Sequence, residues 1–277
     1  MQIRSTRGSR RGAPSGVSVT LRPVPAVKSS RLDASDWQRR GEEPDGLSQH
    51  LWLKRLEDGQ LWLFKPVEVK GGHRQGEDWA EKAVSELATV LGVPCARIEL
   101  AIRDGIEGLV SRDVKPRRWD LQPGAAVLDG VVPGYESRTR LREGHTIENI
   151  QQALRGMASP PGHTLIEGLT AYDTFCGYLT LDALVANRDR HDHNWAVVIP
   201  PGVGSARLAA SFDHASSLGF SLRDERRRQL ISIGTLGPLG RARHGLAFPA
   251  QTSDELGRNT CRSRCSGAHD GVWCRPE

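Results

Sequence analysis

The stretch ANRDRHDHNWAVVIPPGVGSARLAASFDHASSLG, residues 186–219, decides the fold that this sequence predicts. After its polar first part come two apolar runs, 195–199 and 207–212, which flank a turn rich in proline and glycine at 200–205. Two short apolar runs on either side of such a turn are typical of a β-hairpin. The sequence therefore predicts a hairpin that directly follows a polar loop.

Three polar residues are expected to meet at the open end of this hairpin. Asn194 precedes the first strand and Asp213 follows the second, so antiparallel pairing brings both to the same end, beside Asp189 of the incoming loop. Two carboxylates and an amide supply the oxygen ligands that Mg²⁺ prefers. Asp189 precedes Asn194 by five residues, the spacing that protein-kinase-type enzymes use for a catalytic base and a metal-holding amide. The pattern predicts a site for phosphoryl transfer.

A lysine at the end of an apolar strand forms the other half of the predicted site. Lys65 ends the apolar run 61–64, where a charge is costly unless it is paired. Glu81 lies beside the apolar stripe of a helix predicted at 77–91 and is expected to face Lys65, with Glu86 as the alternative partner. Kinases bind nucleotide phosphates with a strand lysine that is paired with a helix glutamate, an arrangement called here the nucleotide clamp.

Outward from the site, the sequence predicts a small sheet with one helix, followed by a mainly helical part. Alternating apolar residues and Asp-Gly turns predict hairpins at 49–65 and 98–110. Residues 113–145, rich in glycine, proline and charge, predict a link, and helices are predicted at 147–157 and 164–186. The stripe of the second helix that is expected to face the core comprises Leu165, Leu169, Tyr172, Cys176, Leu179 and Ala183.

Four segments resemble those of HipA-like kinases, and they occur in the same order. The segments are WLFKP (62–66), LATVLGVP (87–94), ANRDRHDHN (186–194) and SFDHASSLG (211–219). DRHDHN (189–194) is also similar to the catalytic loop of phosphatidylinositol 3- and 4-kinases. No G-x-G-x-x-G loop is present, and KGGHRQG (70–76) is its nearest substitute.

The resemblance implies an α+β, bilobal protein-kinase-like fold with a small β-rich N-lobe and a mainly helical C-lobe. It implies ATP and Mg²⁺ as cofactors, with Lys65 on the phosphates and Asp189 as the base. Asn194 and Asp213 would hold the metal. The lipid-kinase likeness makes His191 a second candidate for the acid/base role. The phosphate acceptor is a hydroxyl whose class stays open among protein Ser/Thr, lipid and small molecule.

The expected organisation has four parts. They are a disordered basic tail at 1–30, the N-lobe with the nucleotide clamp at 31–118, the C-lobe with catalytic loop and metal hairpin at 119–220, and an atypical tail, read as disordered, at 221–277. Because the last part lacks a clear apolar period, an incomplete C-lobe and impaired activity are alternatives to a complete enzyme.

Two other functions stay open. In the first, His191, His193 and Asp213 form the core of a zinc or manganese site in a metal-dependent hydrolase. Asp189, Asp192 and His214 are its further candidate ligands. In the second, the chain is a non-catalytic nucleotide-binding pseudokinase, an alternative that the atypical tail favours.

Composition limits the compartment and the partners. The net charge of +5 favours anionic partners. Nucleic acid stays an alternative partner through the basic tails, although their arginine runs lack interleaved aromatic residues. No apolar run approaches the ~20 residues of a membrane helix, and the N-terminus lacks a secretory h-region, so a cytoplasmic protein without a transmembrane segment is expected.

Cysteine usage agrees with that compartment, because five cysteines, an odd number, argue against a disulfide framework. Cys95 and Cys176 lie in apolar surroundings and are expected in the core. Zinc binding by the tail is left open, and its candidate ligands are Cys261, Cys265, His269 and Cys274.

Overall fold

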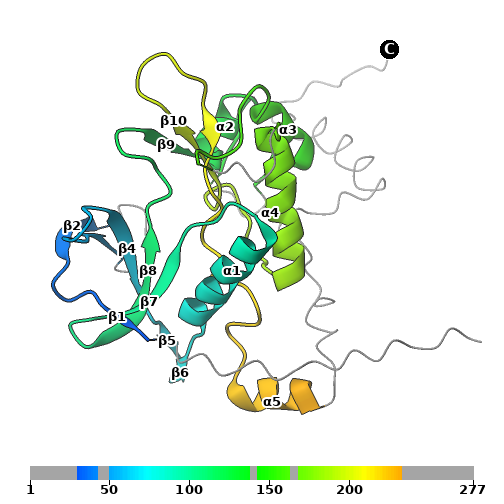
Figure 1. Cartoon of the computed structure of the whole chain (residues 1–277). Coiled ribbons are helices and arrows are strands. Elements are labelled where there is room, and N and C mark those ends of the chain that lie inside the picture. The colour runs from blue at the N-terminus through cyan, green and yellow to red at the C-terminus, as the bar shows by residue number, and fades with distance from the viewer. Residues whose placement is uncertain (1–29, 43–49, 138–141, 163–167, 233–277) are drawn as a thin grey trace, which may run out of the picture. The chain divides into compact units, whose positions relative to one another are not determined.

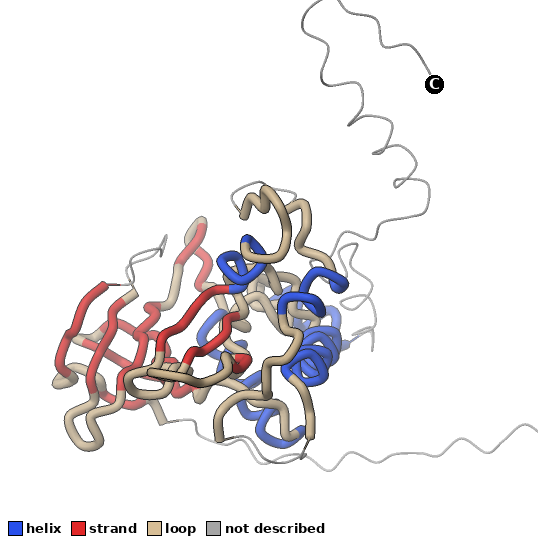
Figure 2. Tube along the Cα trace, turned by 90° about the horizontal axis from the view of Figure 1, so that it is seen from above, coloured by secondary structure: helices blue, strands red, loops and turns tan. Residues whose placement is uncertain are grey.

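The computed structural model describes residues 30–42, 50–137, 142–162 and 168–232 (Figure 1). From Arg31 onward these residues belong to one compact unit. Strands gather on one side of this unit and helices on the other (Figure 2). Within the described residues, no helix is long and apolar enough to span a membrane. Ser30 apart, the predicted tail at 1–30 lies outside the described residues, as do the four candidate zinc ligands near the C-terminus.

The first part of the unit is a six-stranded sheet that carries helix α1. In sheet order its strands are β1 (Leu32–Asp33), β7 (Ile98–Arg103), β8 (Ile106–Arg112), β4 (Leu61–Pro66), β3 (Leu51–Lys54) and β2 (Gln38–Glu42). Both predicted hairpins are confirmed as β3–β4 and β7–β8, and α1 (Glu77–Leu91) has the predicted bounds. α1 ends at Gly92, whose φ of 71° is the left-handed conformation that a helix C-cap favours.

Four strands of this part were not predicted. Strands β1 and β2 extend the sheet at its two edges. Residues 66–76, for which no regular element was predicted, contain a short hairpin, β5 (Val69–Lys70) and β6 (His73–Arg74). Gly71 and Gly72 form its turn with φ values of 58° and 72°, which glycine adopts without strain.

The second part combines helices with a three-stranded antiparallel sheet of order β11-β10-β9. Its elements are β9 (Asp120–Pro123), α2 (Gly124–Asp129), α3 (Ile147–Ala153), α4 (Ala171–Val185), β10 (Ala196–Ile199), β11 (Arg207–Leu208) and α5 (Asp224–Ser232). The predicted hairpin is confirmed as β10–β11. The predicted link at 113–145 is wrong in part, because β9 pairs with β10 and α2 follows it directly.

Helix α5 corrects the expectation that no regular element follows residue 220. Its residue Leu230 is buried, and the guanidinium of Arg227 lies 5.0 Å from the centre of the Trp79 ring on α1. Leu230 and Arg227 thus hold α5 against the rest of the unit. The rest of the predicted C-terminal tail, from 233, lies outside the described residues.

Helix α4 begins later than predicted and buries a different face. It starts after Thr170, which forms a capping box with Asp173. Its buried residues are Ala171, Thr174, Phe175, Tyr178, Leu181, Asp182 and Val185. Cys176, predicted in the core, is exposed. Periodicity failed because α4 is apolar nearly all round, so that no stripe marks the inner face.

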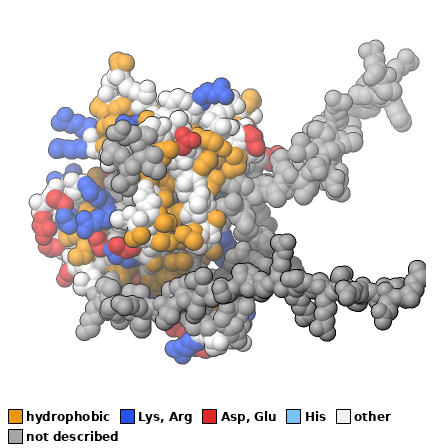
Figure 3. Space-filling view, turned by 45° about the vertical axis from the view of Figure 1, so that its right-hand side comes forward, with side chains coloured by type: hydrophobic (Ala, Val, Ile, Leu, Met, Phe, Trp, Pro, Cys, Tyr) orange, Lys and Arg blue, Asp and Glu red, His pale blue; other side chains and the backbone are white. Residues whose placement is uncertain are grey.

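The core has one cluster that joins α4 to the first part of the chain. Leu181 and Val185 of α4 pack against Val84 and Ala88 of α1. On the surface, hydrophobic side chains gather in the middle of the face shown in Figure 3. The helix that precedes the predicted site is thus packed directly on the helix that carries Glu81.

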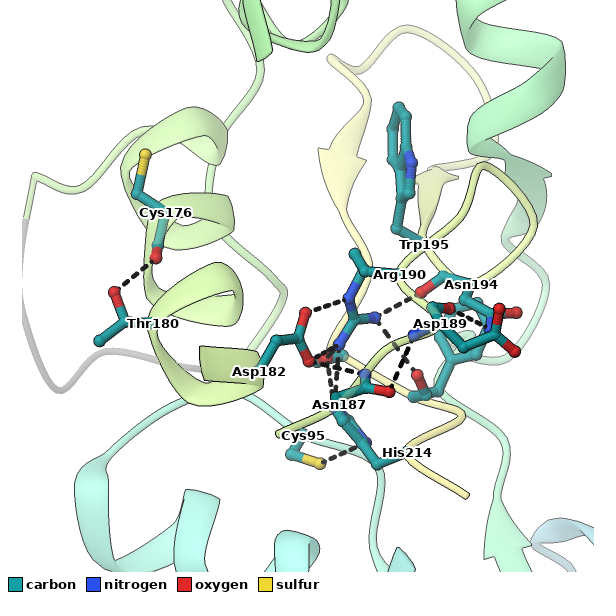
Figure 4. A network of polar contacts seen from close by, with 12 residues as sticks. Cys95, Cys176, Thr180, Asp182, Asn187, Asp189, Arg190, Asn194, Trp195 and His214 are labelled. Carbon is teal, nitrogen blue, oxygen red and sulfur yellow. Dashed lines mark hydrogen bonds and ion pairs between the residues drawn. The ribbon is translucent and has the colours of Figure 1, made fainter. Parts of the chain in front are cut away.

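A buried ion pair fixes the loop between α4 and β10 (Figure 4). Arg190 is 1% exposed and Asp182 is fully buried. Arg190 Nε lies 2.7 Å from Asp182 Oδ2, and Nη2 lies 2.9 Å from Asp182 Oδ1, a bidentate pair. Asn187 Nδ2 donates to the same carboxylate at 2.8 Å. The first residues of the polar loop are therefore anchored to α4.

The same guanidinium also holds both ends of the hairpin. Arg190 Nη1 donates to the carbonyl oxygens of Asn194 and Phe212, and Nη2 donates to Ser211 Oγ at 2.9 Å. His214 Nε2 lies 3.0 Å from Nη2, and burial lowers the pKa of His214 to about 3, so this ring is a neutral acceptor. A guanidinium has five N–H donors, and here every nitrogen has partners.

Removing the guanidinium would leave a buried carboxylate without its charge partner. We expect Arg190→Leu to lower the free energy of unfolding by about 3–5 kcal/mol, as broken buried pairs do. Urea titrations followed by tryptophan fluorescence measure this change. Arg188→Leu is the matched control, because Arg188 is an exposed residue of the same loop and should shift stability by less than about 0.5 kcal/mol. Equal losses in the two variants would contradict a structural role for the pair.

Candidate functional site

Lys65 lies at the centre of the site that the sequence predicts. Its Nζ is 3.0 Å from Glu81 Oε1 on α1 and 3.2 Å from Asp213 Oδ1 behind β11. The Lys65 side chain is 16% exposed and that of Glu81 only 1%. The predicted contact between Lys65 and Glu81 is present. The alternative partner Glu86 points elsewhere, since it pairs with Lys82 on the surface of α1.

The charges at this junction are strongly coupled. Burial acts to lower the pKa of Lys65, but the negative charges of Asp213 and Glu81 outweigh it and raise that pKa above its ordinary value. The Lys65 charge lowers the pKa of Asp213. Burial raises the pKa of Glu81, although Lys65 opposes this effect. The lysine is therefore a permanent cation, and Asp213 is its ionised partner.

One oxygen of this cluster is left over. Glu81 Oε2 is buried and has no hydrogen-bond partner among the described residues. Buried polar atoms are normally satisfied, so an orphan acceptor needs an explanation. An acceptor beside a permanent cation suits a site whose remaining partners come with a bound group. A carboxylate oxygen is satisfied by a hydrogen-bond donor or a cation, so the Lys65 ammonium is the group of this cluster that suits an anionic ligand.

The loop that carries Asp189 is closed by backbone contacts. The Asp189 N–H donates to Asn187 Oδ1 at 3.2 Å. Asn194 Nδ2 donates to the Asp189 carbonyl oxygen at 2.7 Å, and the two residues lie side by side in Figure 4. Because Nδ2 is engaged in this way, Oδ1 is the atom of Asn194 that remains for a cation. The Asp189 side chain itself is half exposed.

The hairpin brings its two ends together as predicted. Val197 pairs with Leu208, and the Ala209 N–H donates to the Ala196 carbonyl oxygen at 2.9 Å. Arg190 Nη1 donates to the carbonyl oxygens of both Asn194 and Phe212, and Phe212 directly precedes Asp213. The structure thus groups Asn194, Asp213 and Lys65 around one end of the hairpin, as the phosphoryl-transfer hypothesis requires. Their catalytic roles stay predictions.

His191 lies between two carboxylates. Its Nε2 is 3.6 Å from Asp189 Oδ1, and its Nδ1 is 3.8 Å from Asp192 Oδ1. Burial lowers the pKa of His191, although both carboxylates oppose this effect. The ring therefore faces Asp189, its rival for the role of base. His193 is exposed and contributes its N–H to His191 Nδ1 at 3.2 Å.

The candidate ligands of the alternative metallohydrolase do not converge. Tyr135 donates its hydroxyl to Asp192 Oδ2 at 2.8 Å, and His214 Nε2 faces Arg190 and Ser211. Across the described ranges, no group of three His, Cys, Asp or Glu side chains is arranged to hold a metal ion. The proposed hydrolase cluster of His191, His193 and Asp213 is therefore not formed.

Sequence reasoning missed the residues that support the site. Arg190 and Asp182 anchor the loop, while Tyr135 and Asp192 hold it from the other side. One signal was available for Asp182, since it is a charged residue in the interior of α4, whose other carboxylate, Asp173, belongs to the N-terminal capping box. Such a residue is rarely buried without a partner. The contact from Tyr135 spans 57 residues and has no local signal.

Comparisons with known proteins agree with this architecture. The structure is similar to that of the Helicobacter pylori proinflammatory kinase CtkA, with a TM-score of 0.58 at 15% identity, over 75% of this chain and 68% of CtkA. It also matches HipA of Shewanella oneidensis MR-1, solved with HipB and operator DNA, with a TM-score of 0.44 at 17% identity, over 65% of this chain and 44% of HipA. The likeness to CtkA confirms the predicted α+β, kinase-like fold.

The sequence itself assigns the family. No curated protein matches the chain. The model of the HipA-like C-terminal domain matches residues 34–260, which is most of the chain. The chain therefore belongs to the family of HipA-like C-terminal domains.

Proposed function

We propose that this protein is a kinase that transfers the γ-phosphate of ATP to a hydroxyl group, with Mg²⁺ as cofactor. One observation carries the proposal: Lys65 Nζ contacts both Glu81 of α1 and Asp213 of the hairpin. Kinases bind Mg-nucleotide with a strand lysine, a helix glutamate that pairs with it, and a metal-binding aspartate. Family membership and the kinase-like fold support the same reaction class.

Each residue of the set has a distinct task. Lys65 binds nucleotide phosphates, and Glu81 holds the lysine in position. Asp213 and the Oδ1 of Asn194 hold Mg²⁺, as their oxygen chemistry favours. When bound, Mg²⁺ supplies positive charge that offsets the charge developing on the phosphate oxygens. Asp189 accepts the proton of the attacking hydroxyl, because its carboxylate is half exposed while its backbone is fixed.

The acceptor is a hydroxyl of a protein, a lipid or a small molecule. The half-exposed position of Asp189 leaves its carboxylate within reach of an incoming group. Phosphoryl transfer requires little covalent chemistry from the protein. Positioning of the reactants and electrostatic stabilisation therefore account for most of the rate enhancement.

The first prediction concerns the nucleotide clamp. Lys65→Met removes the cation that faces the phosphates, so we expect the thermal shift induced by Mg-ATP to disappear and phosphate transfer to fall at least ~10²-fold. Each shift is measured against the same variant without nucleotide, since loss of the buried ion pair also lowers the starting stability. Lys82→Met is the control, because Lys82 pairs with Glu86 and Glu99 away from the hairpin. A Lys65→Met protein with normal transfer would refute the clamp.

The second prediction concerns the base. Asp189→Asn keeps the backbone contacts of the loop but removes the proton acceptor, so transfer should fall by ~10²–10⁴-fold. Binding of ATP, measured by calorimetry, should persist. Asp104→Asn, at an exposed turn between β7 and β8, controls for the loss of a carboxylate. If His191→Ala reduces transfer more than Asp189→Asn does, the imidazole is the base instead.

A further inference from the structure

A fully buried carboxylate within the catalytic loop has no task in the proposed reaction. Asp192 is 0% exposed, although its neighbours His191 and His193 reach solvent. Tyr135 donates its hydroxyl to Asp192 Oδ2 at 2.8 Å, and Arg142 Nε lies 2.8 Å from Oδ1. The backbone is held as well, since the Ala125 N–H donates to the Asp192 carbonyl oxygen at 2.9 Å. Asp192 thus connects the catalytic loop to a different stretch of chain.

These contacts come from the region that the sequence presents as a link. Tyr135, Arg142 and His145, here called the brace, lie between α2 and α3. His145 Nε2 accepts the indole N–H of Trp195 at 3.2 Å, at the start of the hairpin. Burial lowers the pKa of His145 to about 4, so the ring is neutral and can accept this bond. The brace therefore contacts the loop at one end and the hairpin at the other.

The brace rests on regular structure. The Val132 N–H donates to the Leu128 carbonyl oxygen of α2 at 2.8 Å, and the Tyr135 N–H donates to the Val132 carbonyl at 3.1 Å. On the other side, Thr146 caps α3 through Asn149. Side chains that are held by packed helices can fix a loop more precisely than the loop can fix itself.

The contacts lead on from Asp192 to the proposed base. His191 lies 3.8 Å from Asp192 Oδ1 and 3.6 Å from Asp189 Oδ1, so its ring separates the anchored carboxylate from the half-exposed one. A half-exposed aspartate has free rotamers unless a neighbour restricts them. The ring, whose Nδ1 accepts the His193 N–H at 3.2 Å, makes no hydrogen bond to either carboxylate, so it restricts Asp189 by packing and charge alone.

We propose that Tyr135 and Arg142 are positioning residues that act through Asp192 and His191 to hold Asp189 in its reactive place. This inference rests on the proposed function. A buried ion pair is a poor device for stability alone, since apolar residues of the same volume serve at least as well. Fixing the conformation of the loop 189–194 explains the buried carboxylate of Asp192 better than a gain in stability does.

The test compares two buried tyrosines that each lose one hydroxyl. Tyr135→Phe removes the bond to Asp192, whereas Tyr178→Phe removes an equivalent bond to the Ala209 carbonyl oxygen, 2.9 Å long, on the hairpin. With the full chain, we expect Tyr135→Phe to lower kcat for phosphate transfer by about 10- to 100-fold, with KM for ATP within about 2-fold. Tyr178→Phe should leave kcat within about 2-fold.

A second readout needs no activity. Amide hydrogen exchange of residues 189–194 should accelerate at least ~10-fold in Tyr135→Phe, and not in Tyr178→Phe. Arg142→Lys, which keeps the charge beside Asp192, should retain kcat better than Arg142→Gln. If the wild type transfers no phosphate, the proposed function fails while hydrogen exchange still tests the brace.

Three results would overturn the inference. Unchanged exchange at 189–194 in Tyr135→Phe would show that the hydroxyl does not hold the loop. Equal losses of kcat in both tyrosine variants would indicate general loosening of the fold. A rise in KM with kcat unchanged would assign Tyr135 to substrate binding rather than to positioning of the base.

Discussion

The bidentate pair of Arg190 with Asp182 is the interaction on which the rest of the structure depends. It is buried on both sides, and the same guanidinium reaches the carbonyl oxygens of Asn194 and Phe212. One side chain thus joins α4, the polar loop and the residues on either side of the hairpin. Because the guanidinium is planar and its donors are fixed in direction, it imposes an angle as well as a distance. The loop conformation follows from that geometry rather than from its own local preferences.

A second pair connects this assembly to the first part of the chain. Lys65 contacts Glu81 and Asp213, and the apolar cluster that contains Val84 and Leu181 joins α1 to α4. The polar contact and the apolar contact differ in kind. Apolar packing resists separation but tolerates sliding, whereas a three-way ion pair has a preferred arrangement. A bound nucleotide would compete with Glu81 and Asp213 for Lys65. The ionic contact of Lys65 can therefore respond to a ligand, while the apolar packing of α1 on α4 persists.

Sequence patterns predicted the local elements and the order of the site, but not the supports. The hairpins β3–β4 and β10–β11 and helix α1 followed from alternation, turn residues and period, which act over a few neighbours. The inner face of α4 did not follow, because a helix that is apolar nearly all round carries no stripe. The contact between Tyr135 and Asp192 could not be predicted either, since folding alone brings these distant residues together. Pairing of Lys65 with Glu81 was accessible because a charge at the end of an apolar strand demands a partner.

The backbone of Asp213 adopts a positive φ angle, which limits the residues that this position accepts. Its φ of 57° lies in the left-handed region, which glycine, asparagine and aspartate enter at low cost and β-branched residues avoid. The turn after β11 therefore restricts which residues can occupy position 213, independently of any catalytic requirement. Over evolutionary time, lineages that drift here can reach asparagine or glycine without strain, and both lack a carboxylate. Either replacement would suit the backbone of this turn and would remove the carboxylate that pairs with Lys65.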